Sequence, residues 1–142
     1  MKINPIPENQ NPVSPYFIVK NIDTMVNFLI SAFDGEIIER LTYENGNAMH
    51  AEVKYHDTVL MIGKASEEFP ATVNMNYIYV ENVDHTFEKA LKAGGAQIIV
   101  PEDRFYGNRD GGIKDPDGNI WWIGSRVEIL TQEELEKRAR KS

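Results

Sequence analysis

An internal repeat at an offset of 61 residues restricts the fold of this chain more than any other feature of its sequence. Residues 19–23, Val-Lys-Asn-Ile-Asp, align without a gap with residues 80–84, Val-Glu-Asn-Val-Asp. Three matching blocks at one spacing indicate two copies of one supersecondary unit, although any two amphipathic strand–helix units share some of this likeness. The other two blocks are 36–38 with 97–99 and 59–63 with 120–124.

Each copy has the pattern of a strand, a helix and three further strands. An alternating stretch from Pro15 to Lys20 is typical of a strand, and Asp23 can cap a helix that runs to about Phe33. The remaining expected strands and helix are 36–43, 48–55, 58–63, 75–80, 84–93 (the helix), 97–100, 112–114 and 119–125. Asn45-Gly46 is a strong hairpin turn between two of these strands.

We therefore predict an α+β fold with two βαβββ modules in tandem, which form a curved mixed sheet around a cavity. The modules span residues 14–70 and 71–128, and residues 1–13 form an extended N-terminal arm. Thr131-Gln132-Glu133-Glu134 is a capping box, so residues 129–142 are expected to contain a short C-terminal helix.

Strand alternation separates two kinds of sheet face. One parity is apolar throughout and is expected to pack under the helices: Phe17, Val19, Leu60, Ile62, Ile78, Val80, Trp121 and Ile123. The opposite parity carries tyrosines, methionines and Trp122. A face of this kind needs a cover, which can be the other module, a partner subunit or a ligand.

Composition excludes several classes of function. The chain has no cysteine, so disulfides and thiolate chemistry are excluded. A formal net charge of -7 argues against a nucleic-acid or anionic-membrane surface. No basic leader or long apolar run is present, and we expect a cytoplasmic protein.

Several motifs carry a family resemblance. The two βαβββ repeats, the Gly94-Gly95 pair and Asp115-Pro116-Asp117-Gly118-Asn119 before the last strand resemble the vicinal oxygen chelate superfamily of glyoxalases, bleomycin-resistance proteins and extradiol dioxygenases. The segments 49–52, 105–112 and 115–123 are most similar to its PhnB-like branch. The resemblance covers about residues 14 to 128. It implies one glyoxalase-like domain with a cavity, within a homodimer.

The superfamily's enzymes hold a divalent metal with one side chain from the first and one from the last strand of each module. The positions that match approximately are Ser14, Met61, Met75 and Trp122. None of these is a ligand for a hard or borderline metal. We therefore expect no metal and no other cofactor, and the resemblance does not extend to glyoxalase or dioxygenase activity.

His50 and Glu52 lie two residues apart on an expected strand and face the same way, which supplies at most two ligands to a metal. They can belong to a solvated strand face that continues to Lys54. Alternatively, His50 points into the cavity mouth as a polar anchor or general base that Glu52 orients. These two are our candidate catalytic residues.

Residues 101–112 combine large planar side chains with glycines, so we expect a loop that can close over a pocket. Arg109 can meet an anion or an aromatic ring there, or it can be structural and pair with Asp110, Asp115 or Asp117. Trp122 is expected to form a wall of the ligand site.

Three hypotheses of function remain open. The first is a metal-free protein that binds a small, partly aromatic or apolar molecule. The second is an enzyme of lyase or dioxygenase type with a non-standard site around His50, Glu52 and Arg109, and the third is a dimeric scaffold with a filled cavity. The expected ligand-binding residues are Tyr16, His50, Met61, Tyr77, Tyr79, Phe105, Arg109 and Trp122.

Overall fold

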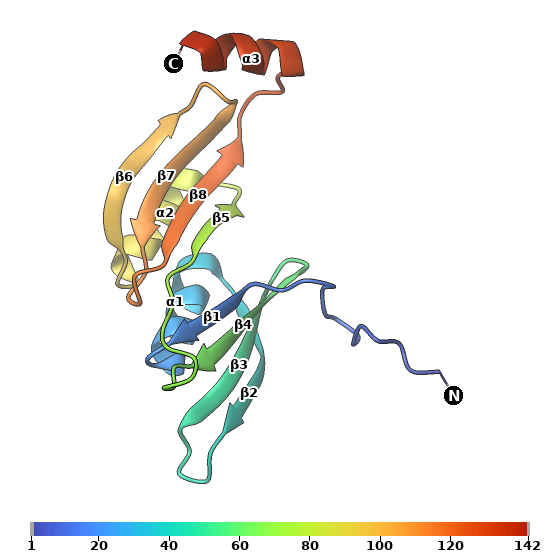
Figure 1. Ribbon diagram of the computed structural model, residues 1–142. Coiled ribbons are helices and arrows are strands. Elements are labelled where there is room, and N and C mark those ends of the chain that lie inside the picture. The colour runs from blue at the N-terminus through green and yellow to red at the C-terminus, as the bar shows by residue number, and fades with distance from the viewer. Residues whose placement is uncertain (1, 142) are drawn as a thin grey trace. The chain divides into compact units, whose positions relative to one another are not determined.

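A computed structural model describes residues 2–141 and divides the chain into two compact units, Met1–Asn74 and Met75–Ser142. Each unit contains one four-stranded mixed sheet and a helix that connects its first two strands (Figure 1). The predicted pair of βαβββ modules is therefore confirmed. Among residues 2–141, no helix is long and apolar enough to cross a membrane.

The first unit begins with strand β1 (Tyr16–Val19) and helix α1 (Ile22–Phe33). Three strands follow: β2 (Glu36–Thr42), β3 (Ala48–Tyr55) and β4 (Thr58–Lys64). The sheet order is β1-β4-β3-β2, in which β1 and β4 run parallel and the other neighbours antiparallel. Strands β1 and β2 lie at opposite edges of this sheet, and α1 connects them along one face of it.

The second unit repeats this arrangement. Its elements are β5 (Met75–Tyr79), α2 (Val83–Lys92), β6 (Ala96–Asp103), β7 (Asn108–Lys114) and β8 (Ile120–Arg126), and the sheet order is β5-β8-β7-β6. The C-terminal helix α3 (Gln132–Lys141) follows, and the Thr131 hydroxyl accepts a hydrogen bond from the Glu134 amide at its start, as the capping box predicts.

Both crossover helices begin slightly earlier than expected. The Asn21 side chain, and not Asp23, caps α1 by accepting a hydrogen bond from the Thr24 amide at 3.0 Å. Asn82 caps α2 in the same way. Asp23 pairs instead with Arg40. The repeated Asn at one position in each module is thus the residue that satisfies the helix's first free amides.

The expected long loop over residues 101–112 is wrong. Strand β6 extends to Asp103 and β7 starts at Asn108, so residues 104–107 form the turn of a hairpin. The pairing of β6 with β7 shifts its register between Ile99 and Glu102, around Pro101. Proline removes a ladder hydrogen bond, and this irregularity lets the strand continue past it.

Helix packing follows the expected strand parity. Of the eight residues predicted to lie under the helices, seven are buried and Val80 is partly exposed. Val59 precedes Leu60 and therefore lies on the other face of the first sheet by strand alternation, yet it is buried. Asn11 accepts a hydrogen bond from the Val59 amide and donates one to the Asp57 carbonyl, so the N-terminal segment lies against β4 there.

A glycine on the last strand of each unit makes room for a tyrosine from the first. A Cβ on Gly63 would lie 2.9 Å from the Tyr16 ring, and a Cβ on Gly124 would overlap the Tyr77 hydroxyl. Each tyrosine therefore lies across its neighbouring strand and reaches the third strand of the sheet. Tyr16 reaches His50, and Tyr77 reaches Asp110.

The Gly124→Ala substitution should lower the free energy of unfolding by about 1–3 kcal/mol, because the added methyl group overlaps the Tyr77 ring. In a Tyr77→Ala background the same change should cost nothing, since the space is then empty. Urea unfolding of the four proteins of this double-mutant cycle gives the coupling. Equal costs of Gly124→Ala in both backgrounds would show that the ring does not require the glycine.

Candidate functional site

Side chains that can bind a ligand or exchange a proton lie along one cross-strand row of the first sheet. Glu39 on β2 lies opposite Glu52 on β3, Glu52 opposite Met61 on β4, and Met61 opposite Tyr16 on β1. Directly paired residues share a sheet face. His50 is two positions from Glu52 on β3, so it shares this face as well. We call this surface, opposite α1, the helix-free face of the first unit.

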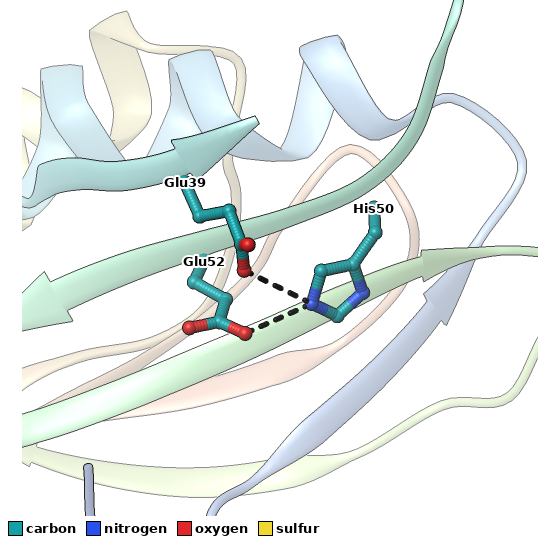
Figure 2. A group of neighbouring side chains, drawn as sticks. All are labelled: Glu39, His50 and Glu52. Atoms are coloured by element: carbon teal, nitrogen blue, oxygen red, sulfur yellow. Dashed lines mark hydrogen bonds and ion pairs between the residues drawn. The ribbon is translucent and has the colours of Figure 1, made fainter. Parts of the chain in front are cut away.

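Three of these side chains point toward one another, as Figure 2 shows. The His50 Nε2 atom lies 3.0 Å from Glu52 Oε2 and 4.0 Å from Glu39 Oε2. One ligand atom from each residue lies within 4.8 Å of the other two. We call Glu39, His50 and Glu52 the Glu-His-Glu cluster. It has two carboxylates and one imidazole in a region small enough for a single cation or a shared proton.

Two further side chains hold the Glu-His-Glu cluster in place. The Tyr16 hydroxyl lies 3.3 Å from His50 Nδ1, so both ring nitrogens of His50 have a partner. Gln10, from the N-terminal segment, donates a hydrogen bond of 2.6 Å to Glu52 Oε1. The amide oxygen of Gln10 is buried without a hydrogen-bond partner among the described residues.

Burial and mutual repulsion set the protonation of the two carboxyls. Glu52 is only 7% exposed, so it does not belong to a solvated face. Burial raises the pKa of Glu52, but hydrogen bonds from His50, Gln10 and Glu39 outweigh this effect, and its pKa lies below the ordinary value. The hydrogen bond to Glu52 and the charge of Glu52 raise the pKa of Glu39. Of the two carboxyls, Glu39 therefore keeps its proton to a higher pH than Glu52 does.

Sequence reasoning identified His50 and Glu52 but missed Glu39. Counting back from the expected two-residue Asn45-Gly46 turn gives the pairing of Glu39 with Glu52, but the structure forms a different turn, in which the Tyr43 amide donates to the Asn47 carbonyl around residues 44–46. A register shift between Leu41 and Thr42 then sets Glu39 opposite Glu52, and no sequence signal predicted that shift.

The second unit carries a different group at the equivalent place. Asp110 pairs with Gly124 as His50 pairs with Gly63, and its side chain is fully buried. Its carboxylate accepts hydrogen bonds from the hydroxyls of Tyr77 and Tyr106 and from Arg104 Nε, and Arg104 also donates to the Asp110 carbonyl. We call these four residues the Asp110 network: Asp110, Tyr77, Tyr106 and Arg104.

Burial and the hydrogen bond to Asp110 raise the pKa of both tyrosines of this network, that of Tyr106 to about 12 and that of Tyr77 further. Both hydroxyls therefore stay protonated and act as donors. The Asp110 network satisfies a buried carboxylate from several sides, which makes it a structural element of the second unit.

The remaining expected ligand-binding residues lie apart from the Glu-His-Glu cluster in the chain. Tyr79 and Phe105 are exposed, and Trp122 on β8 is partly exposed. Arg109 pairs with Asp84 of α2 at 2.8 Å and with Asp103 of β6 at 3.3 Å. Its partners thus differ from the aspartates considered above, and its role toward a ligand stays a prediction.

The positions that match the family's metal ligands do not fit a metal in this chain. Met61, Met75 and Trp122 offer a thioether or an indole in place of imidazole or carboxylate. The Ser14 hydroxyl is buried without a hydrogen-bond partner among the described residues, but a neutral hydroxyl alone does not hold a divalent ion. We derive no chemistry through a metal at these four positions.

Comparison with known families decides the identity of the fold. The sequence model of the glyoxalase/bleomycin resistance protein/dioxygenase superfamily matches residues 11–123, which is more than half of the chain. The chain belongs to this superfamily. Among curated relatives of this superfamily member, an uncharacterized protein of Mycobacterium tuberculosis strain H37Rv is 26% identical, with 87% of this chain and 79% of the relative covered.

Solved structures of low sequence identity share the superfamily fold. TioX from Micromonospora sp. ML1 has a TM-score of 0.72 at 19% identity and covers 82% of this chain and 99% of its own. A PhnB protein from Bacillus cereus, described as a putative 3-demethylubiquinone-9 3-methyltransferase, has a TM-score of 0.60 at 20% identity, with 80% and 98% covered.

A point mutant of the fosfomycin resistance protein FosX from Listeria monocytogenes, in complex with Mn(II) and 1S,2S-dihydroxypropylphosphonic acid, has a TM-score of 0.65 at 19% identity. It covers 91% of this chain and 97% of its own. At such identities the likeness of these structures shows the shared fold of the superfamily and does not transfer an activity.

Proposed function

We propose that this superfamily member binds a small, partly aromatic or apolar molecule on the helix-free face of its first unit, without a metal at the family's four positions. The observation that carries the proposal is the hydrogen-bonded series Tyr16–His50–Glu52, which lies beside the apolar side chain of Met61. Ligand sites typically combine apolar walls with a few well-placed polar groups.

The surroundings of the series support this role. Tyr16 is 47% exposed while its hydroxyl is held near His50, so part of this aromatic residue is open to contact with a planar ligand. Gln10 and Glu52 fix the imidazole from the other end. A side chain held in this way loses little conformational entropy when a ligand binds, which favours affinity.

A second candidate function is catalysis at His50. Its Nε2 atom is 3.0 Å from a mostly buried carboxylate, which is the geometry that orients an imidazole as a general base. Arg109, which the sequence grouped with this site, pairs with Asp84 and Asp103. The catalytic candidate therefore rests on His50 and Glu52 alone.

Thermal unfolding with a panel of hydroxylated and aminated bicyclic aromatic compounds tests the binding proposal. Measurements are made in the presence of a chelator, so that metal binding does not contribute. A compound that binds should raise the stability as RT ln(1 + [L]/Kd), about 2.7 kcal/mol at one hundred times Kd. Tyr16→Ala and Met61→Lys should reduce the shift at least tenfold in apparent affinity.

Tyr43→Ala is the matched control, because Tyr43 is also 47% exposed but lies beyond the end of β2. This variant should keep the full response. The binding proposal fails if no compound stabilises the protein, or if Tyr43→Ala weakens the response as much as Tyr16→Ala does.

A further inference from the structure

We propose that the Glu-His-Glu cluster is a site for one divalent transition-metal ion, on β2 and β3 and outside the family's four ligand positions. The proposal goes beyond the function given above, since it concerns a cation and not the organic ligand. It also revises the expectation from sequence that His50 and Glu52 supply at most two ligands, because Glu39 is the third.

The spacing of the donor atoms fits a common centre. Bonds from Zn²⁺ to imidazole and carboxylate are about 2.0–2.2 Å long, which places ligand atoms about 3–3.5 Å from each other. His50 Nε2 and Glu52 Oε2 already lie 3.0 Å apart. Glu39 Oε2 is 4.0 Å from the imidazole, and the Glu39 side chain is 42% exposed. A bound ion would require Glu39 Oε2 to move closer to the imidazole, and its exposed side chain is not held by neighbours on all sides.

The charge balance of the cluster also calls for a cation. Glu39 and Glu52 are a directly opposed cross-strand pair, and like charges in such a pair are destabilising. Within residues 2–141, the ion-pair partner that the structure gives both of them is His50, which is charged only when protonated. A bound divalent ion would neutralise the pair.

The groups around the cluster resemble the outer partners of a metal site. Metal-ligating histidines usually hydrogen-bond through their second nitrogen, and ligating carboxylates are hydrogen-bonded in turn. Here the Tyr16 hydroxyl lies at His50 Nδ1, and Gln10 donates to Glu52. The amide oxygen of the same Gln10 side chain is buried and has no hydrogen-bond partner among the described residues.

The donor set favours one class of metal. One imidazole with two carboxylates suits Zn²⁺ or Mn²⁺, whereas Ca²⁺ prefers a larger shell of oxygen ligands. Three protein ligands leave coordination positions for water or a ligand on the open side of the sheet. The site is thus expected to discriminate Zn²⁺ and Mn²⁺ from Ca²⁺.

Equilibrium dialysis of the full chain tests the site. The protein is first stripped with a chelator and then dialysed against Zn²⁺ or Mn²⁺, with no aromatic compound present, and bound metal is measured by elemental analysis. We expect one ion per chain. Glu39→Gln, which removes a charge but keeps the shape of an exposed side chain, should weaken Kd at least tenfold, and His50→Ala should abolish stoichiometric binding.

The double variant His85→Ala/Glu88→Gln is the matched control. It removes an exposed histidine and an exposed glutamate from α2 in the second unit and should bind metal like the unmodified chain. Circular dichroism establishes that each variant folds, and Glu39→Gln decides the outcome if His50→Ala does not fold.

The proposal is overturned if the unmodified chain binds less than one ion. It is also overturned if Glu39→Gln binds the metal as tightly as the unmodified chain. Equal loss in the α2 control would also overturn it, because the binding would then be nonspecific. The binding of aromatic compounds is measured in chelator and metal binding without those compounds. Failure of one proposal is therefore distinguishable from failure of the other.

Discussion

Replacing Asp110 by alanine is expected to lower the free energy of unfolding by about 3–5 kcal/mol, which is the usual cost of removing one partner from a buried ion pair. The Asp110 side chain is fully buried, and Arg104, which it pairs with at 2.9 Å, is itself only 16% exposed. Without Asp110, the guanidinium and the hydroxyls of Tyr77 and Tyr106 lose a common acceptor. Urea unfolding followed by tryptophan fluorescence measures the loss.

Two variants sharpen this test. The free energy of unfolding of Asp110→Asn should lie between those of the unmodified protein and Asp110→Ala, because an amide keeps the side-chain volume but accepts hydrogen bonds only through its oxygen. Asp103→Ala removes a 72% exposed partner of Arg109 and should change stability little. A loss below about 1 kcal/mol for Asp110→Ala would mean that the network is not the structural element that its burial indicates.

Asp115→Ala is expected to cost at least about 2 kcal/mol, because two buried side-chain donors lose an acceptor at about 1–3 kcal/mol each. Asp115 is 5% exposed and begins the turn that leads into β8. Its carboxylate accepts hydrogen bonds from Trp121 Nε1 at 2.9 Å and Asn119 Nδ2 at 3.0 Å. It also accepts from the backbone amides of Asp117 and Asn119.

The change in tryptophan fluorescence and the urea midpoint together measure this effect, since the Trp121 environment should change with it. Asn45→Ala is the comparison, because Asn45 also accepts a hydrogen bond in a turn, from the Asn47 amide, but is exposed. Asn45→Ala should lower the free energy of unfolding by less than Asp115→Ala does. Equal losses would show that the buried donors do not depend on Asp115.

The sequence predicts most of the fold because the repeat and the strand alternation are local signals. Matching Val-x-Asn-Ile/Val-Asp segments located both helix starts to within two residues, and parity located most of the buried positions. The helix cap was misplaced by two residues, because Asn21 and Asp23 are both good caps and only the backbone shows which one is used. Homodimer formation and a cytoplasmic location stay predictions.

The hairpin at residues 101–112 and Glu39 of the Glu-His-Glu cluster were missed for a shared reason. Both depend on strand register, which pairing between strands sets and composition does not. Glycines and a proline suggested a loop, although Gly111 is where a Cβ would meet the Pro101 ring across the hairpin. Glu39 becomes part of a site only because β2 and β3 pair in a register that sets it against Glu52.

The glycine that admits a tyrosine in each unit has a consequence for how the two halves of the chain can diverge. In both halves a glycine leaves room for a tyrosine, whose hydroxyl reaches His50 in the first half and Asp110 in the second. In a duplicated fold of this kind, stability and binding chemistry can depend on different copies, since one copy can keep its buried network while the other changes its side chains. When residues of the first half are changed to alter its specificity, the equivalent positions of the second half can therefore serve as an internal comparison.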